Sequence, residues 1–150
     1  MNQARIDELI PKAMDIIHSD SGTFTKMGVD GEIKIDSSYN GYMNSIGPAI
    51  IQAGLFKTVT AFQKSSASGR TEGDKAVIND IIKKLLLTSG HYTETEKDLS
   101  LLKIVVDRIN NRGTTIRLKE EDRIFEAITA FKLTFDMFEK FDKDNEQKGG

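Results

Sequence analysis

Hydrophobic residues recur every three or four positions along most of the chain, a spacing that places them on one face of an α-helix. The pattern starts at Ile6 and is still present at Phe138. Because amphipathic helices bury their apolar faces against one another, it predicts an all-α fold, a compact bundle of five or six helices. The stripes are Ile6, Ile10, Ala13, Met14 and Ile17; Tyr39, Tyr42, Ile46, Ile50 and Ala53; Leu55, Val59 and Phe62; Val77, Ile78, Ile81, Ile82, Leu85 and Leu86; Leu99, Leu102, Val106 and Ile109; and Ile124, Ile128, Phe131, Phe135 and Phe138.

Glycine and proline positions indicate where these helices begin and end. Gly54, Gly90 and Gly113 each follow a stripe and are placed to end a helix. Pro11 lies inside the first stripe, where it is expected either to kink the helix or to mark its true start.

Residues 23–36 interrupt the helical period. Their hydrophobic positions alternate weakly around Asp30-Gly31, a dipeptide suited to a two-residue hairpin turn. We therefore expect a small β-hairpin at about 23–36, attached to a single helical domain of residues 1–141. Residues 142–150, DKDNEQKGG, lack an apolar stripe and predict a disordered tail.

Acidic residues cluster where helices are expected to begin. Thr93 and Glu96 have the spacing of a capping box, which predicts a helix that opens there and contains Leu99. Residues 120–122, Glu-Glu-Asp, precede the last stripe, where negative charge interacts favourably with the helix dipole. These carboxylates have structural explanations, and catalysis would require the fold to bring them into a shared cleft.

Composition narrows the class of protein. A chain of 150 residues fits one domain, and it is 38% hydrophobic and 29% charged, with no cysteine and no apolar run long enough to span a bilayer. The first residues carry acids where a secretory signal would be basic and then apolar. These features predict a cytoplasmic protein without disulfides. The net charge of -2 gives no general attraction for nucleic acid, so binding to a polyanion would need a local patch.

Known catalytic and cofactor motifs are absent from the sequence. His18 and His91 are far apart and have no neighbouring cysteine or acid-histidine pattern, which argues against a metal site. The chain contains no phosphate-binding loop, no dinucleotide fingerprint and no nucleophile elbow. We expect no enzymatic activity, no catalytic residues, no metal and no cofactor.

One region stands out by its charge. No Asp or Glu occurs from Ser37 to Thr71, although 23 of the 150 residues are acidic, and the bases there are Lys57, Lys64 and Arg70. One interpretation is that these helices are the most buried and that the bases merely rim them. The other is that the region approaches phosphates, which a carboxylate would repel.

The last stripe is rich in phenylalanine. Phe131, Phe135 and Phe138 share one face, while Phe125 and Phe141 widen the arc beyond what one neighbouring helix covers. The arc is explained either by core packing alone or by partner binding at its edge residues, Phe125 and Phe141.

An ordered set of residues in the acid-free region matches a known signature. It comprises Tyr39, Tyr42, residues 46–51 (Ile-Gly-Pro-Ala-Ile-Ile), Gly54-Leu55 and residues 58–62 (Thr-Val-Thr-Ala-Phe). This set resembles the signature of the small α-helical subunit of type III-B CRISPR-associated effectors, the fifth of the Cmr proteins. Gly47 stands where proline is usual, and Ala61-Phe62 is displaced by one residue.

The resemblance implies a non-catalytic role in antiviral defence. Copies of such a subunit line one side of an RNA-guided ribonucleoprotein, the Cmr complex, and touch the guide RNA and the target RNA while other subunits cut. Its partners would be the other Cmr subunits and copies of itself, with no membrane, and the isolated chain would be mostly monomeric. Lys57, Lys64 and Arg70 would then each neutralise one phosphate. A possible extension of this strip comprises Lys83, Lys84, Lys103, Arg108 and Arg112, although interspersed acids also fit a solvated helix face.

The alternative is a helical protein–protein adaptor with no nucleic-acid role. Such a protein would use the phenylalanine-rich last helix to bind its partner. The two hypotheses differ in whether the acid-free region binds RNA.

Overall fold

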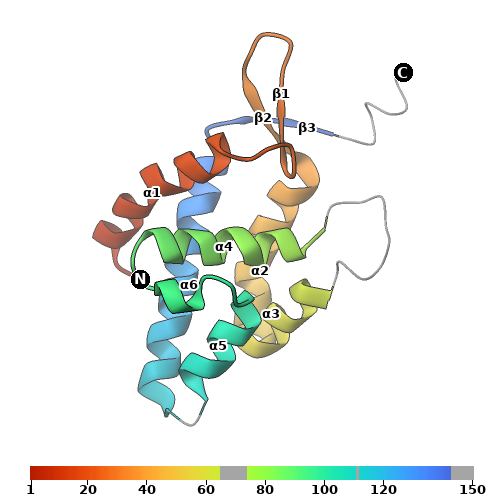
Figure 1. Cartoon of the computed structure of the whole chain (residues 1–150). Coiled ribbons are helices and arrows are strands. Elements are labelled where there is room, and N and C mark those ends of the chain that lie inside the picture. The colour runs from red at the N-terminus through yellow and green to blue at the C-terminus, as the bar shows by residue number, and fades with distance from the viewer. Residues whose placement is uncertain (65–73, 111, 143–150) are drawn as a thin grey trace.

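The computed structural model describes residues 1–64, 74–110 and 112–142, which form a helical bundle with a small sheet at one end (Figure 1). The predicted fold class, an all-α bundle with a small β element, is confirmed. The α-helices of the described part are α1 (Gln3–His18), α2 (Ser37–Ala53), α3 (Leu55–Lys64), α4 (Ala76–Thr88), α5 (Leu101–Ile109) and α6 (Thr114–Phe135).

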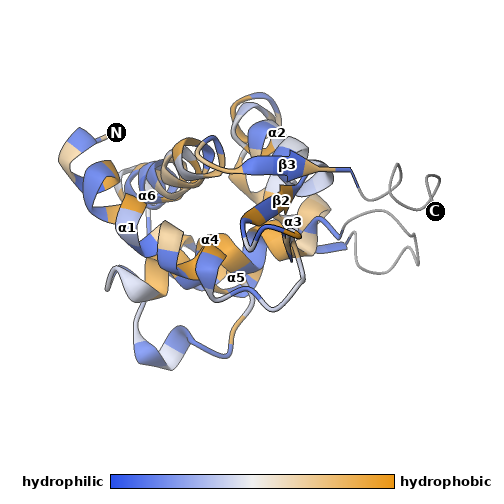
Figure 2. Cartoon of the chain, turned by 90° about the horizontal axis from the view of Figure 1, so that it is seen from above, coloured by the Kyte–Doolittle hydropathy of each residue, from blue (hydrophilic) through white to orange (hydrophobic). Residues whose placement is uncertain are grey.

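Helix α6 runs through the length of the molecule, and α1, α2, α4 and α5 pack against it (Figure 1). Phe131 and Phe135 of α6 are fully buried at the centre of one hydrophobic core. Hydrophobic and hydrophilic residues alternate around the helices in the view from above, as amphipathic helices require (Figure 2). No helix of the described residues is long and apolar enough to cross a membrane.

The junction between α2 and α3 lies at the predicted glycine. Gly54 has a φ of +93°, a conformation that favours glycine, and its N–H donates to the carbonyl oxygen of Ile50 at 2.8 Å. Leu55 then starts α3 and is buried. By contrast, Pro11 does not mark a helix start, because α1 continues through it from Gln3.

The prediction for the start of α5 was wrong. The capping box of Thr93 and Glu96 is present, but it heads a short 3₁₀-helix, η2 (Glu94–Glu96). Helix α5 begins at Leu101, and its N-cap is Ser100. Lys83 explains the interruption, because its Nζ donates to the carbonyl oxygens of Lys97 and Leu99 and thus engages the intervening segment in tertiary contacts. The buried face of α5 is consequently Leu101, Ile104, Val105 and Ile109.

Helix α6 also differs from its prediction at both ends. It starts at Thr114, so Glu120 lies well inside the helix rather than in its first turn. It stops at Phe135, where the Nζ of Lys140 donates to the carbonyl oxygens of Phe135 and Phe138 at 2.7 and 2.6 Å. A cation near the last carbonyl of a helix interacts favourably with the helix dipole. Phe141 therefore lies outside the helix.

Three short strands form the sheet, in the order β1-β2-β3. Strands β1 (Thr25–Met27) and β2 (Ile33–Asp36) are antiparallel and form the predicted hairpin. The turn is wider than predicted: Gly31 donates to the carbonyl oxygen of Gly28, and Gly31 has a φ of +83°. The sequence did not predict β3 (Glu139–Phe141), which pairs in parallel with β2. Of the predicted tail, only Asp142 lies within the described residues.

Candidate nucleic-acid interface

The outer face of α3 presents two lysines. Lys57 and Lys64 are exposed, whereas Leu55, Val59 and Phe62 on the opposite side are buried. Seven residues are two turns, so the lysines share a face and are about 10 Å apart along the axis. Within the described part of the chain, neither lysine has an ion-pair or hydrogen-bond partner for its ammonium group. Arg70, the third predicted phosphate ligand, lies outside the described residues.

A buried amide holds α3 against α4. Asn79 of α4 is fully buried, and its Nδ2 donates to the carbonyl oxygen of Val59 at 3.0 Å and to Oε1 of Gln63 at 3.2 Å. The two acceptors lie one turn apart on α3, and Gln63 immediately precedes Lys64. Since a buried amide is expensive to leave unpaired, these bonds favour one position of α3 on the bundle.

The aromatic residues of the signature lie between helices. The hydroxyl of Tyr39 accepts the backbone N–H of Asp74 at 3.0 Å, and its ring meets that of Tyr42 edge to face. The ammonium of Lys75 lies 5.5 Å from the ring centres of both Tyr42 and Phe62, within range of a cation–π attraction. These rings join α2 and α3 to the residues that precede α4. Their role in this structure is therefore positioning.

The structure divides the predicted extension of the strip into two groups. Lys83 bonds to backbone carbonyls, Lys103 pairs with Asp107 at 3.0 Å, and Arg108 is held by carboxylates. Lys84 and Arg112 are exposed, and no side-chain partner is found for either among the described residues. Only this second pair remains available to extend the α3 surface.

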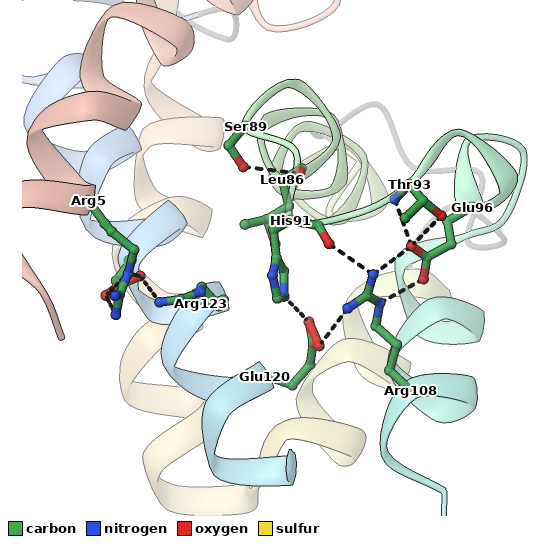
Figure 3. A network of polar contacts seen from close by, with 10 residues as sticks. Arg5, Leu86, Ser89, His91, Thr93, Glu96, Arg108, Glu120 and Arg123 are labelled. Atoms are coloured by element: carbon green, nitrogen blue, oxygen red, sulfur yellow. Dashed lines mark hydrogen bonds and ion pairs between the residues drawn. The ribbon is translucent and has the colours of Figure 1, made fainter.

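A network of charged groups encloses Arg108 (Figure 3). Its Nε and Nη2 lie 2.7 Å from the two carboxylate oxygens of Glu96, and Nη2 also donates to the carbonyl oxygen of His91. Nη1 lies 3.5 Å from Oε2 of Glu120, whose Oε1 is 2.7 Å from Nε2 of His91. The guanidinium also lies 4.8 Å from the ring centre of Tyr92. The network joins the α4–α5 connection, α5 and α6.

The contacts in this network shift the pKa values of Glu96 and Tyr92. Hydrogen bonds from Arg108, with smaller contributions from Thr93, lower the pKa of Glu96 to about 2 against an opposing effect of burial. Burial raises the pKa of Tyr92 well above its usual value. No local pattern in the sequence reveals the network, because His91 and Glu120 are 29 residues apart. The resulting histidine–carboxylate pair bonds inward to Arg108, which favours a structural role.

The carboxylate of Glu126, also on α6, likewise accepts hydrogen bonds from several donors. Glu126 accepts from the Nε and Nη2 of Arg5, from Nη1 of Arg123 and from the backbone N–H of Asn2. Burial by itself would raise the pKa of Glu126, but the hydrogen bonds from Arg5 and Asn2 outweigh it, so the pKa lies below its usual value. These contacts hold α1 against α6.

A cavity of about 400 Å³ lies between the two clusters. Arg5, Glu8 and Lys12 of α1, His91, and Arg123 and Glu126 of α6 supply its charged and titratable lining. Its lining contains charges of both signs, and Glu126 already pairs with Arg5 and Arg123. In the described part of the chain, no group of three or more His, Cys, Asp or Glu residues could hold a metal ion.

The two predicted partner-binding phenylalanines lie in different places. Phe125 is half-buried and lines a groove of about 340 Å³ between α2 and α6, next to Ile51, which is 77% exposed. Phe141 lies in β3, and the ammonium of Lys26 is 5.4 Å from its ring centre. The prediction of one helical arc that contains both was wrong, because α6 ends before Phe141. The complete lining of the groove is Gly47, Pro48, Ile51, Gln52, Phe125, Ile128, Thr129 and Lys132.

Comparison of the chain with protein-family models, with curated proteins and with solved structures finds no match. Two of the surfaces described above present groups that the fold leaves available: the lysine face of α3 and the α2–α6 groove.

Proposed function

We propose that the chain is a non-catalytic small subunit of a type III-B CRISPR RNA-guided antiviral effector, the Cmr complex. It binds the backbone of the guide or target RNA through the outer face of α3 and neighbouring subunits through the α2–α6 groove. The observation that carries the proposal is the exposed pair Lys57 and Lys64, on a helix without carboxylates and with no side-chain partner among the described residues.

Simple electrostatics favour phosphate as the ligand of this face. A lysine ammonium is a mobile point charge that binds single phosphate oxygens, and each contact releases a counterion from the nucleic acid. An Asp or Glu on the same helix would repel the backbone, and α3 has none. Such contacts do not read base sequence, as is appropriate for a subunit that follows an RNA whose sequence varies.

The signature residues support the proposal by their structural use. Gly54 reverses the chain between α2 and α3, and Leu55 and Phe62 are buried beneath the lysine face. Tyr39 and Tyr42 pack at the other end of α2. Gly54, Leu55 and Phe62 of the signature thus support α3, while the lysines occupy its solvent side.

The proposed RNA contact is tested by the salt dependence of binding. The isolated chain should bind single-stranded and duplex RNA weakly, without sequence preference, and less tightly as salt rises. Replacement of Lys57, Lys64 and Arg70 together by Ala should lower the slope of log K against log salt by about two to three. The matched control is Lys12→Ala, Lys97→Ala and Lys119→Ala, which removes the same charge from other elements. Equal slopes for the two triple variants would refute the RNA role of α3.

The groove favours a second candidate function, the helical adaptor. Its apolar lining and the exposed Ile51 fit a protein partner whether or not RNA is present. An adaptor would bind its partner with unchanged affinity after ribonuclease treatment and would show no slope difference in the assay above. Recovery of the tagged chain with large effector subunits and RNA from its host would contradict the adaptor.

A further inference from the structure

The β1–β2 hairpin projects from the bundle (Figure 1). Exposed apolar side chains lie at its end. Val29 at its tip is fully exposed, and Met27 beside it is 63% exposed. Single exposed apolar residues are common on protein surfaces and need no function by themselves. These residues indicate a binding function only if another surface is complementary to them.

Backbone hydrogen bonds and the carboxylate of Asp30 hold the tip. The backbone N–H of Gly28 donates to the carbonyl oxygen of Glu32 at 2.6 Å, that of Gly31 donates to the carbonyl oxygen of Gly28 at 3.0 Å, and that of Glu32 donates to Oδ1 of Asp30. None of these bonds uses the side chain of Val29. The hairpin therefore presents a preformed apolar point. Asp30 and Glu32 beside it are acidic and exposed, whereas the ammonium of the nearby Lys34 lies 3.7 Å from Oε2 of Glu139. A preformed point loses little entropy when it binds.

The α2–α6 groove has the complementary properties. Its walls are apolar, with Pro48 and Ile51 from α2 and Phe125 and Ile128 from α6. The single charged residue in its lining is Lys132, and no partner for the ammonium is found among the described residues. An acidic, apolar-tipped segment is therefore a better match for this groove than a basic one.

We propose that the hairpin tip of one copy binds the α2–α6 groove of a second copy. Val29 inserts beside Ile51 and Phe125, and the carboxylate of Asp30 approaches the ammonium of Lys132. The assignment rests on the proposed function in one respect, namely that several copies lie together along an RNA. Because tip and groove are different surfaces, each bound copy leaves one of each free, and the contact repeats in a head-to-tail row. A contact through one small tip is weak, so it acts when copies are held in register.

Cysteine cross-linking of the isolated chain tests this contact without RNA or other subunits. The chain has no cysteine, so single substitutions give unambiguous disulfides. A Val29→Cys protein is mixed at high concentration with a size-tagged Ile51→Cys protein under mild oxidation. The control mixture uses Met137→Cys in place of Ile51→Cys, because Met137 is a 61% exposed apolar residue outside the groove. The expected result is several-fold more mixed disulfide with Ile51→Cys, and equal yields would overturn the proposal.

Exchange of the two charges of the proposed Asp30–Lys132 pair tests that contact directly. Lys132→Glu in the Ile51→Cys protein should reduce the mixed disulfide several-fold, and Asp30→Lys in the Val29→Cys protein should restore it. Thermal melts establish that each variant is folded. Failure of rescue would overturn the Asp30–Lys132 pairing. These measurements use no RNA, so a negative cross-linking result together with a positive salt-slope result would remove only the head-to-tail contact.

Discussion

Helices α3 and α6 carry charge in opposite ways. The charged residues of α3, Lys57 and Lys64, are exposed, have the same sign and lack partners in the described part of the chain. Helix α6 buries Glu120 at 3% exposure and Glu126 at 1%. Both carboxylates are satisfied by bases from distant segments, with His91 and Arg108 at Glu120.

The difference distinguishes exposed charges, which a ligand can reach, from buried charges, which hold helices together. A buried carboxylate with several donors has no capacity left for a ligand, and removal of one donor leaves it uncompensated. An exposed lysine without a partner costs little to remove, and its full charge is available to a phosphate. Partner geometry therefore decides which bases of this chain are available to a phosphate, and residue type alone does not.

The largest effect is expected in the core of α6. Phe131→Ala should lower the free energy of unfolding by about 3 to 5 kcal/mol, because it truncates a fully buried ring. Phe125→Ser on the same helix should change it much less, because that ring lies at the half-buried groove. Urea denaturation of both variants measures the contrast. Equal losses would place Phe125 in the core and remove the groove as a partner surface.

The next effect concerns the support network. Arg108→Ala should destabilise the protein by about 2 to 3 kcal/mol, less than for a fully buried pair because 25% of the Arg108 side chain is exposed. Arg112→Ala is the matched control, since Arg112 is exposed, and we expect a change within about 0.5 kcal/mol. Comparable values in urea denaturation would show that Arg108 is not held as described.

A smaller effect should follow from pH. The pKa of Glu96 is about 2 in the folded protein, against a usual value of 4.5. A lowered folded-state pKa adds stability that is present above pH 4.5 and is lost as the pH falls through about 2. The melting temperature of the native protein should therefore exceed that of Glu96→Gln by a margin that shrinks from pH 4.5 to pH 2. A constant margin would mean that the carboxylate charge is not the source of the stability.

The smallest effect on stability is expected for the lysine face. Lys57→Ala with Lys64→Ala should alter the free energy of unfolding by no more than about 0.5 kcal/mol, because both side chains are exposed and neither ammonium has a partner among the described residues. Thermal melts of the double variant check this, beside the loss in salt slope described above. A loss above about 1 kcal/mol would indicate that the lysines support the fold and would remove the contrast with α6.

Helices α2 and α5 show where the local residue pattern is sufficient to predict the bounds of a helix. The spacing from Tyr39 to Ala53 and the glycine after it predicted α2 and its end, because both depend on neighbours within one or two turns. The same reasoning placed the start of α5 too early. There a distant side chain, Lys83, bonds the backbone between Thr93 and Leu101, and no local signal reveals such a contact.

The candidate site shows the same division. The acid-free region and the opposite placement of Lys57 and Phe62 were predictable, since both are properties of one helix. The sequence did not reveal that Tyr42 and Phe62 lie against Lys75, or that Phe125 lines a groove with Ile51. Each of these contacts joins different elements.

The sequence by itself determined that the chain forms amphipathic helices around one core, that α3 lacks carboxylates and that residues 23–36 form a hairpin. Only the tertiary structure decided which charges are paired, as in Arg5 with Glu126 across 121 residues, and where β3 joins the sheet. The physical reason is the separation along the chain of the residues that interact. Side chains three or four positions apart share a helix face in any context, so periodicity is a local property. An ion pair or a parallel strand pair between distant residues exists only after the helices have packed, since packing alone sets their separation.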